Sequence, residues 1–78
     1  MQPDVVILDL LMPGRNGLEV LSELRSDERL AAIAVVVLTA QPASVEDAIR
    51  AGASRVMIKP VTVDEINAAV EDVLAAWE

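Results

Sequence analysis

The chain has 78 residues, of which 54 % are hydrophobic, and its 13 acidic and six basic side chains give a net charge of −7. This length allows a single domain, and the acidity argues against a nucleic-acid partner, whose phosphates need clustered Lys and Arg. The absence of cysteine and histidine from the sequence excludes disulfides, thiolate chemistry and histidine-based catalysis. No signal peptide and no apolar run of about 20 residues occur, so we expect a cytoplasmic protein without membrane contact.

The first third of the chain predicts a strand, a loop and a helix. Val5 to Leu8 form a continuous apolar run, which is typical of a strand covered on both faces in a parallel sheet, and Asp9 ends it. Pro13 and Gly14 predict a loop over Leu10 to Arg15. The pattern from Asn16 to Glu19 is that of a capping box, which predicts a helix as far as about Arg25.

The middle of the chain repeats this order. Ala34 to Leu38 are apolar and largely β-branched, which predicts a second strand, and Thr39 ends it. Ser44 is the expected N-cap of a short helix. Gly52 is the expected left-handed stop of that helix.

The last third predicts a third strand and the longest helix. The strand covers Arg55 to Ile58 and is ended by Lys59-Pro60. Thr62 to Glu65 form a second capping box, and the helix that it opens runs to about Trp77. The apolar positions of this helix follow one face: Ile66, Ala69, Val70, Val73, Leu74 and Trp77.

Three strand–helix units in succession imply right-handed crossovers and a parallel sheet. Each strand ends in a polar residue: Asp9, Thr39 and Lys59. The ends of parallel strands lie together at one edge, about 4.8 Å apart, so these side chains can converge on one small anion.

Each of these residues also has a simpler interpretation. An Asp before a Pro-Gly loop is often a turn residue, a Thr closing a strand often bonds only within its own turn, and a Lys before Pro is usually solvated. Asp4 lies at the far end of the first strand and is interpreted as a surface residue. No glycine-rich, phosphate-cradling loop follows any strand, which places a nucleotide-binding enzyme last among the candidate functions.

The sequence resembles the receiver domain of two-component response regulators. The resemblance is carried by the apolar run that ends at Asp9, by Met12-Pro13-Gly14 and Asn16-Gly17, and by Thr39 and Lys59-Pro60 at the next two strand ends. It implies a flavodoxin-like, doubly wound parallel sheet in truncated form. The chain starts just before what would be the third strand, so residues 1–78 are expected to form one partial domain with the order β-α-β-α-β-α.

The resemblance also implies roles. Asp9 would accept a phosphoryl group from a histidine kinase, Thr39 would hydrogen-bond one phosphoryl oxygen, and Lys59 would pair with another. Pro60 would follow a cis peptide bond, and the backbone carbonyl of Leu11 would join Asp9 in binding Mg²⁺. The chain would then be a signalling module in a phosphorelay and not an enzyme.

Three departures from the family pattern predict weak chemistry. One is the absence of the helix that covers half of one sheet face in a receiver. The acidic pair that ends a receiver's first strand is absent, so Mg²⁺ should bind weakly or not at all. Val56 stands where a receiver has an aromatic switch residue. The alternative function is therefore a non-phosphorylated interaction module that forms a homodimer through the exposed edge of Val5 to Leu8.

Overall fold

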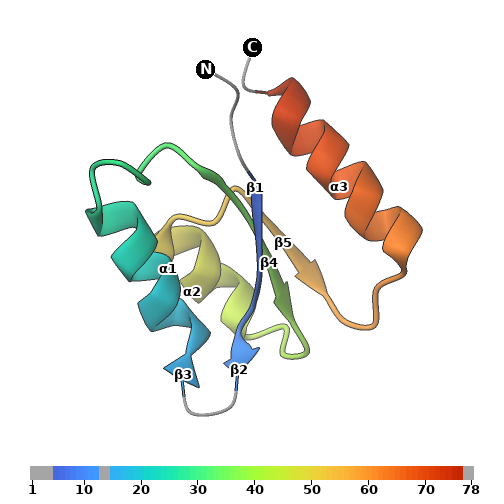
Figure 1. Cartoon of the computed structure of the whole chain (residues 1–78). Coiled ribbons are helices and arrows are strands. Elements are labelled where there is room, and N and C mark those ends of the chain that lie inside the picture. Colours follow the sequence, from blue (N-terminus) through green and yellow to red (C-terminus); the bar gives the residue numbers. More distant parts are fainter. Residues whose placement is uncertain (1–4, 13–14, 77–78) are drawn as a thin grey trace.

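The computed structural model describes residues 5–12 and 15–76. Its centre is a parallel sheet with the strand order β1-β4-β5, joined by three helices, and a short antiparallel hairpin follows the first strand (Figure 1). The elements are β1 (Val5–Asp9), β2 (Leu11–Met12), β3 (Arg15–Asn16), α1 (Gly17–Ser26), β4 (Ala34–Thr39), α2 (Ser44–Ala51), β5 (Arg55–Ile58) and α3 (Val63–Ala75).

The sheet lies between two layers of helix, with α1 and α2 on one face and α3 on the other (Figure 1). All six residues of β4 are buried, because this strand is central and its side chains alternate between the two faces. Val35 and Val37 pack with Leu21 of α1 and Ala48 of α2. Val36 and Leu38 pack with Ala69 of α3.

The predicted β-α-β-α-β-α order and the parallel sheet are confirmed. The third strand has the predicted limits, and the first two each extend by one residue to include Asp9 and Thr39. β1 lies at one edge of the described sheet, as expected. Within the described residues, no helix has both the length and the apolar character needed to cross a bilayer.

Three of the four predicted cap residues are caps. Asn16 is the N-cap of α1 and accepts the N–H of Leu18 at 2.9 Å, although a capping box with Glu19, which was also predicted, is not seen among the described contacts. Thr62 and Glu65 form the complete capping box of α3. Gly52 ends α2 with φ of 110°. The prediction for Ser44 was wrong: Ala43 is the N-cap without a side-chain bond, and Ser44 is already the first helical residue.

The predicted loop from Leu10 to Arg15 was wrong in part, because it contains the β2–β3 hairpin. Leu11 pairs with Asn16, and Met12 with Arg15. Strands of two residues are too short to show an alternating pattern, so the sequence gives no sign of them. Pro13 and Gly14, for which the turn was predicted, lie outside the described residues, as do Asp4 and Trp77.

Candidate functional site

Asp9 stands at the carboxyl end of β1, where its side chain has two partners. One carboxylate oxygen, Oδ1, accepts the backbone N–H of Leu11 at 2.9 Å. The other, Oδ2, accepts a hydrogen bond from Nζ of Lys59, which lies 50 positions later in the chain. The Lys59 and Asp9 side chains are 34 % and 37 % exposed, so the pair is reachable from solvent.

Lys59 is positioned by the end of β5. Its backbone N–H donates to the carbonyl of Thr39 at 2.8 Å, which extends the β4–β5 ladder by one residue. The peptide bond between Lys59 and Pro60 is cis, as expected. The two strand ends that flank β4 therefore present one cation and one anion to the same point.

The electrostatics of the pair keep Asp9 ionised. The hydrogen bond from Lys59 is the largest influence that lowers the pKa of Asp9 below its ordinary value of 3.8, and the Leu11 N–H adds to it. Partial burial acts in the opposite direction and is outweighed. At neutral pH Asp9 is thus a carboxylate, the form that can act as a nucleophile.

Thr39 lies at the same edge of the sheet but bonds within its own turn. Its side chain is buried, and Oγ1 accepts the N–H of Gln41 at 3.1 Å and donates to the Gln41 carbonyl at 3.4 Å. This is the local turn bond considered as the simpler interpretation. Convergence of Thr39 with Asp9 and Lys59 on one anion stays a prediction.

A shallow hollow of about 270 Å³ lies beside Thr39. It opens between the segment that follows β1 and the segment that follows β4, so it adjoins the sheet edge that carries Asp9. Its residues are Leu10, Leu11, Asn16, Leu18, Thr39, Ala40, Gln41 and Ser44. Sequence reasoning missed Gln41 and Ala40, because a loop residue beside a strand end carries no pattern of its own.

The described residues do not fit a metal ion by themselves. They contain no group of three or more Asp, Glu, His or Cys side chains that could hold one. Asp9 is a single carboxylate already paired with Lys59, whereas Mg²⁺ takes six oxygen ligands in octahedral geometry. The Leu11 carbonyl as a second ligand stays a prediction.

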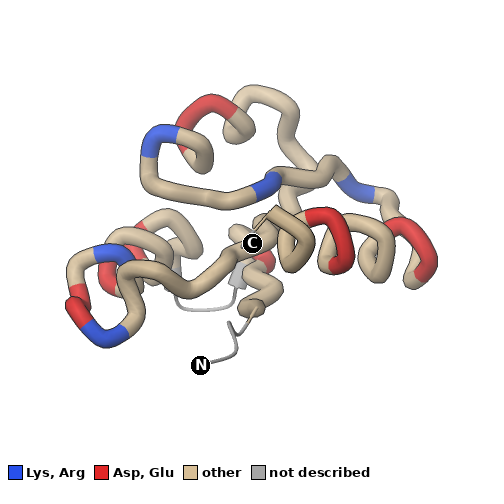
Figure 2. Tube along the Cα trace, turned by 90° about the horizontal axis from the view of Figure 1, so that it is seen from above, with Lys and Arg blue, Asp and Glu red and all other residues tan. Residues whose placement is uncertain are grey.

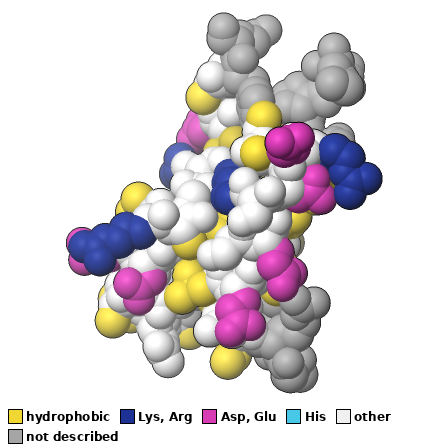
Figure 3. All heavy atoms as spheres, turned by 90° about the vertical axis from the view of Figure 1, so that its left-hand side faces the viewer, with side chains coloured by type: hydrophobic (Ala, Val, Ile, Leu, Met, Phe, Trp, Pro, Cys, Tyr) yellow, Lys and Arg dark blue, Asp and Glu magenta, His cyan; other side chains and the backbone are white. Residues whose placement is uncertain are grey.

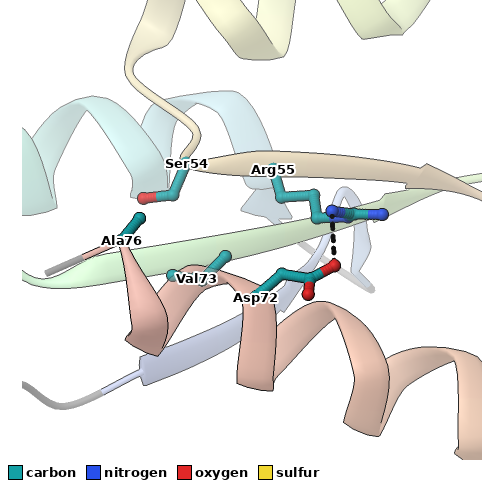
Figure 4. A pocket seen from close by; sticks show the side chains of 5 residues that line it. All are labelled: Ser54, Arg55, Asp72, Val73 and Ala76. Carbon is teal, nitrogen blue, oxygen red and sulfur yellow. Dashed lines mark hydrogen bonds and ion pairs between the residues drawn. The ribbon is translucent and has the colours of Figure 1, made fainter.

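A second hollow, of about 400 Å³, lies at the opposite end of the strands (Figure 4). It is lined by Ser54 and Arg55 at the start of β5 and by Asp72, Val73 and Ala76 near the end of the chain. Arg55 and Asp72 form an ion pair at 3.3 Å, with side chains 46 % and 67 % exposed. Arg55 and Asp72 are the two titratable side chains that line this hollow, and they pair with each other at the surface.

Comparison with known proteins places these features in one family. The family described as "Response regulator receiver domain" matches residues 1–71. The chain is 41 % identical over 78 residues to the probable methanogenesis regulatory protein FilR2 of Methanothrix harundinacea, covering 96 % of this chain and 50 % of that protein. It is 34 % identical over 70 residues to the chemotaxis protein CheY of Listeria monocytogenes, covering 90 % and 59 %.

A solved structure shows the same fold. The putative response regulator from Chloroflexus aurantiacus superposes with a TM-score of 0.85 at 29 % identity, over 94 % of this chain and 62 % of that one. The chain therefore spans less than two thirds of each of these three proteins.

Proposed function

The chain belongs to the response regulator receiver domain family, and we propose that Asp9 is its phosphoacceptor in two-component signalling. One observation carries this proposal. Asp9 ends the apolar strand β1, and the ammonium group of Lys59 keeps its partly exposed carboxylate ionised. A carboxylate that only closed a turn would need no cation from a strand end 50 residues away.

The proposed reaction transfers a phosphoryl group from a phosphohistidine of a histidine kinase. A carboxylate oxygen of Asp9 attacks phosphorus, the P–N bond breaks, and its electron pair stays on the imidazole, which takes up a proton. The product on Asp9 is an acyl phosphate. Lys59 then binds one phosphoryl oxygen, and Thr39 turns its hydroxyl from Gln41 to another, because this chemistry depends on positioning and charge neutralisation.

We further propose that this chemistry is weak in the isolated chain. Lys59 neutralises part of the negative charge of the incoming phosphoryl group. The single carboxylate of Asp9, however, is too few ligands to bind Mg²⁺ tightly. Mg²⁺ concentrations on the order of 10 mM should be needed for any labelling. The chain acts as an acceptor in this account and not as an enzyme that turns over a substrate.

Intact mass spectrometry with acetyl phosphate tests the proposal. We expect a mass gain of one phosphoryl group that is slow, rises with Mg²⁺ between about 1 and 10 mM, and disappears in Asp9→Asn. Glu46→Gln, which breaks an exposed ion pair with Arg50 in α2, is the matched control and should label normally. Labelling that persists in Asp9→Asn would overturn the assignment.

Self-association through β1 is a second candidate function, and the open edge of that strand favours it. The Leu10 N–H donates to Leu38 of β4 at 3.0 Å. Because backbone groups alternate along a strand, Val6 and Leu8 also face β4, whereas the N–H and C=O of Ile7 face the open edge. Such an unpaired edge is a ready template for a second chain.

Proline scanning and light scattering at about 100 μM test this candidate, since even a micromolar dimer would be nearly saturated there. Ile7→Pro should give a folded monomer, because it removes an N–H that only a partner chain would use. Val6→Pro should disrupt the subunit itself by removing a bond to β4. A wild-type chain that is monomeric at this concentration would rule out the homodimer.

We propose no direct contact with nucleic acid and a cytoplasmic location. The net charge is −7, and the basic positions of the described chain are scattered over several elements and do not gather on one side (Figure 2). Phosphate backbones are bound by clustered cations. Binding of a DNA duplex at about 0.15 M salt, seen by fluorescence anisotropy, would contradict this part of the proposal.

A further inference from the structure

The hollow beside Thr39 borders the proposed phosphorylation site, but transfer from a kinase gives it no role. Leu10 and Leu11 directly follow Asp9, and both line the hollow. The backbone N–H of Leu11 donates to Oδ1 of Asp9 at 2.9 Å. Thr39, at the end of the neighbouring strand β4, lines the hollow as well. A molecule that delivers a phosphoryl group to Asp9 therefore comes next to this hollow.

The lining of the hollow combines aliphatic and neutral polar side chains. Its aliphatic part consists of Leu10, Leu11, Leu18 and the methyl group of Ala40. Leu11 is 81 % exposed, the largest fraction among the exposed large hydrophobic side chains of the described residues. None of the eight residues that line the hollow is acidic or basic, although the sequence has 13 acidic and six basic side chains. The hollow therefore suits a short apolar group.

The polar part of the lining includes two side-chain amides. The bonds between Gln41 and Thr39 use the backbone N–H and carbonyl of Gln41 and not its side chain. Asn16 accepts the N–H of Leu18 with its amide oxygen. The amide nitrogens of Gln41 and Asn16 are hydrogen-bond donors, and such donors stabilise a carboxylate that forms beside them.

The leaving group decides which phosphoryl donor suits this lining. An imidazole that leaves a phosphohistidine takes up a proton, and no residue that lines the hollow is an acid that would supply it. A carboxylate that leaves an acyl phosphate needs no proton, because carboxylic acids are ionised at neutral pH. The volume of about 270 Å³ is smaller than that of a pocket for a drug-sized ligand, so it suits a group of a few carbon atoms.

We propose that the hollow is a subsite for the acyl chain of short-chain acyl phosphates, bound by Leu11, Leu18 and Ala40. This inference rests on the proposed role of Asp9 as phosphoacceptor and adds a class of small-molecule donor. Butanoyl phosphate fits better than acetyl phosphate, because its two additional methylene groups lie against the aliphatic side chains. A carboxylate oxygen of Asp9 attacks phosphorus, the P–O bond to the acyl group breaks, and its electron pair stays on the departing butanoate. No proton moves in this step.

Exposed apolar side chains alone do not define the subsite. On the side of the molecule formed by α1 and α2, hydrophobic side chains occur in small groups between charged ones (Figure 3). Ile49 of α2 is 59 % exposed and does not line the hollow. The apolar side chains of the hollow differ from such groups because they adjoin the carboxylate of Asp9. Ile49 is therefore the matched control for Leu11.

Labelling rates with a series of acyl phosphates test the proposal. Initial rates are measured by intact mass spectrometry with acetyl, propanoyl and butanoyl phosphate at equal, subsaturating concentrations and one Mg²⁺ concentration. The three departing carboxylates have nearly the same basicity, so a difference in rate reports on binding of the acyl chain. Full burial of one methylene group corresponds to about a fourfold change, and we expect the rate to rise by about threefold to tenfold from acetyl to butanoyl phosphate.

Two substitutions change the hollow, and the ratio of the butanoyl to the acetyl rate is the readout. Leu11→Ser removes an apolar side chain and should lower this ratio to about one. Ala40→Leu fills the hollow and should lower the ratio further, because the longer chain is excluded. Ile49→Ser removes an exposed aliphatic side chain from α2 and should keep the wild-type ratio.

An analogue that cannot transfer its phosphoryl group tests binding without chemistry. Butanoylphosphonate has a P–C bond in place of the P–O bond that breaks. At about 10 mM, where a millimolar complex is largely formed, it should shift the amide resonances of Leu11, Leu18 and Gln41 in the ¹⁵N-labelled chain. Acetylphosphonate should shift them less, and the resonance of Ile49 should not move with either compound.

The outcomes separate this inference from the proposed function. Equal rates with the three donors, in labelling that still depends on Asp9, overturn the subsite and leave the phosphoacceptor role intact. An equal fall of the ratio in Ile49→Ser also overturns the subsite. Labelling that persists in Asp9→Asn overturns the phosphoacceptor role instead. If no donor labels the chain, the phosphonate decides, and unmoved resonances of Leu18 and Gln41 at about 10 mM overturn the subsite.

Discussion

Arg25 and Lys59 are cations at opposite ends of the same sheet, and their partners differ. Arg25 donates from its guanidinium to the carbonyls of Gly52 at 2.9 Å and Ala31 at 3.0 Å, to the carbonyl of Ile33, and to the Ser54 hydroxyl at 3.4 Å. These groups come from the segments that lead into β4 and β5. Lys59 instead donates a hydrogen bond to a single group, the carboxylate of Asp9.

The difference separates a structural cation from a functional one. Arg25 satisfies backbone carbonyls that have no other side-chain donor in the described contacts, so its removal should cost stability. Lys59 belongs to a pair whose side chains are about one-third exposed, and the net contribution of such a pair to stability is small. Replacing Lys59 should reduce phosphorylation of Asp9 and change the free energy of unfolding only slightly.

Arg25→Met should have the largest effect. It leaves three carbonyls without their donor and should lower the free energy of unfolding by about 2–4 kcal/mol. Chemical denaturation followed by circular dichroism measures this loss. The control is Arg29→Met, since Arg29 is 87 % exposed in its pair with Asp27 and should change stability by less than about 0.5 kcal/mol. Equal losses in the two variants would remove the structural role of Arg25.

Gly52→Ala should have the next largest effect. Gly52 has φ of 110°, and an added Cβ would lie 2.8 Å from Cγ of Arg25. Backbone strain and the displaced Arg25 together should cost about 1–3 kcal/mol of unfolding free energy. The loss should shrink in an Arg25→Ala background, which removes the Cγ, Cδ and Nε atoms that the added Cβ would meet, and strictly additive losses would show that Arg25 is not displaced.

Lys59→Met should change the free energy of unfolding by less than about 1 kcal/mol, because the pair is one-third exposed. The same variant should lose labelling at Asp9, since no cation then neutralises the incoming phosphoryl group. Measured together, stability and labelling separate the two roles. A large loss of stability with normal labelling would place Lys59 with Arg25 as a structural residue.

The smallest effect is a dependence of stability on pH. Lys59 lowers the pKa of Asp9 below 3.8 in the folded chain. The ionised carboxylate of Asp9 therefore stabilises the folded state relative to the unfolded state. The stabilisation is complete above the unfolded pKa of 3.8 and is lost as the pH falls through the lowered folded value. Between pH 5 and about 2.5, the melting temperature should therefore fall less steeply with falling pH in Lys59→Met than in the wild type. Identical slopes would contradict the ion pair.

The carboxyl end of the sheet was easier to predict than the amino end, for a physical reason. Asp9, Thr39 and Lys59 each interrupt an apolar run, and parallel strands bring such interruptions to one edge. The acceptors of Arg25 are mostly backbone carbonyls, which leave no trace in a sequence. The prediction for Arg25 was accordingly limited to the end of α1.

Short turns and hairpins were the other features that the sequence did not predict. The backbone N–H of Ser44 donates to the Gln41 carbonyl at 2.9 Å, and Ala43 is the N-cap in place of Ser44, a residue type that usually takes that position. The β2–β3 hairpin rests on two pairs of residues and has no periodic pattern. Helix starts are thus predicted well where a side chain makes the capping bond, as at Asn16 and Thr62, and poorly at Ala43, where no side chain does. The end of α2 at Gly52 was predictable because its positive φ favours glycine.

The central claim is that three strand ends act on one phosphoryl-like anion, and beryllofluoride tests it most directly. In the ¹⁵N-labelled chain with about 10 mM Mg²⁺, we predict that resonances of Leu11, Gln41 and Lys59 shift together, because Asp9 binds beryllium and Thr39 leaves its bond with Gln41. Asp9→Asn should abolish all three shifts. A spectrum of the wild type that is unchanged by beryllofluoride, or shifts that persist in Asp9→Asn, would contradict the account.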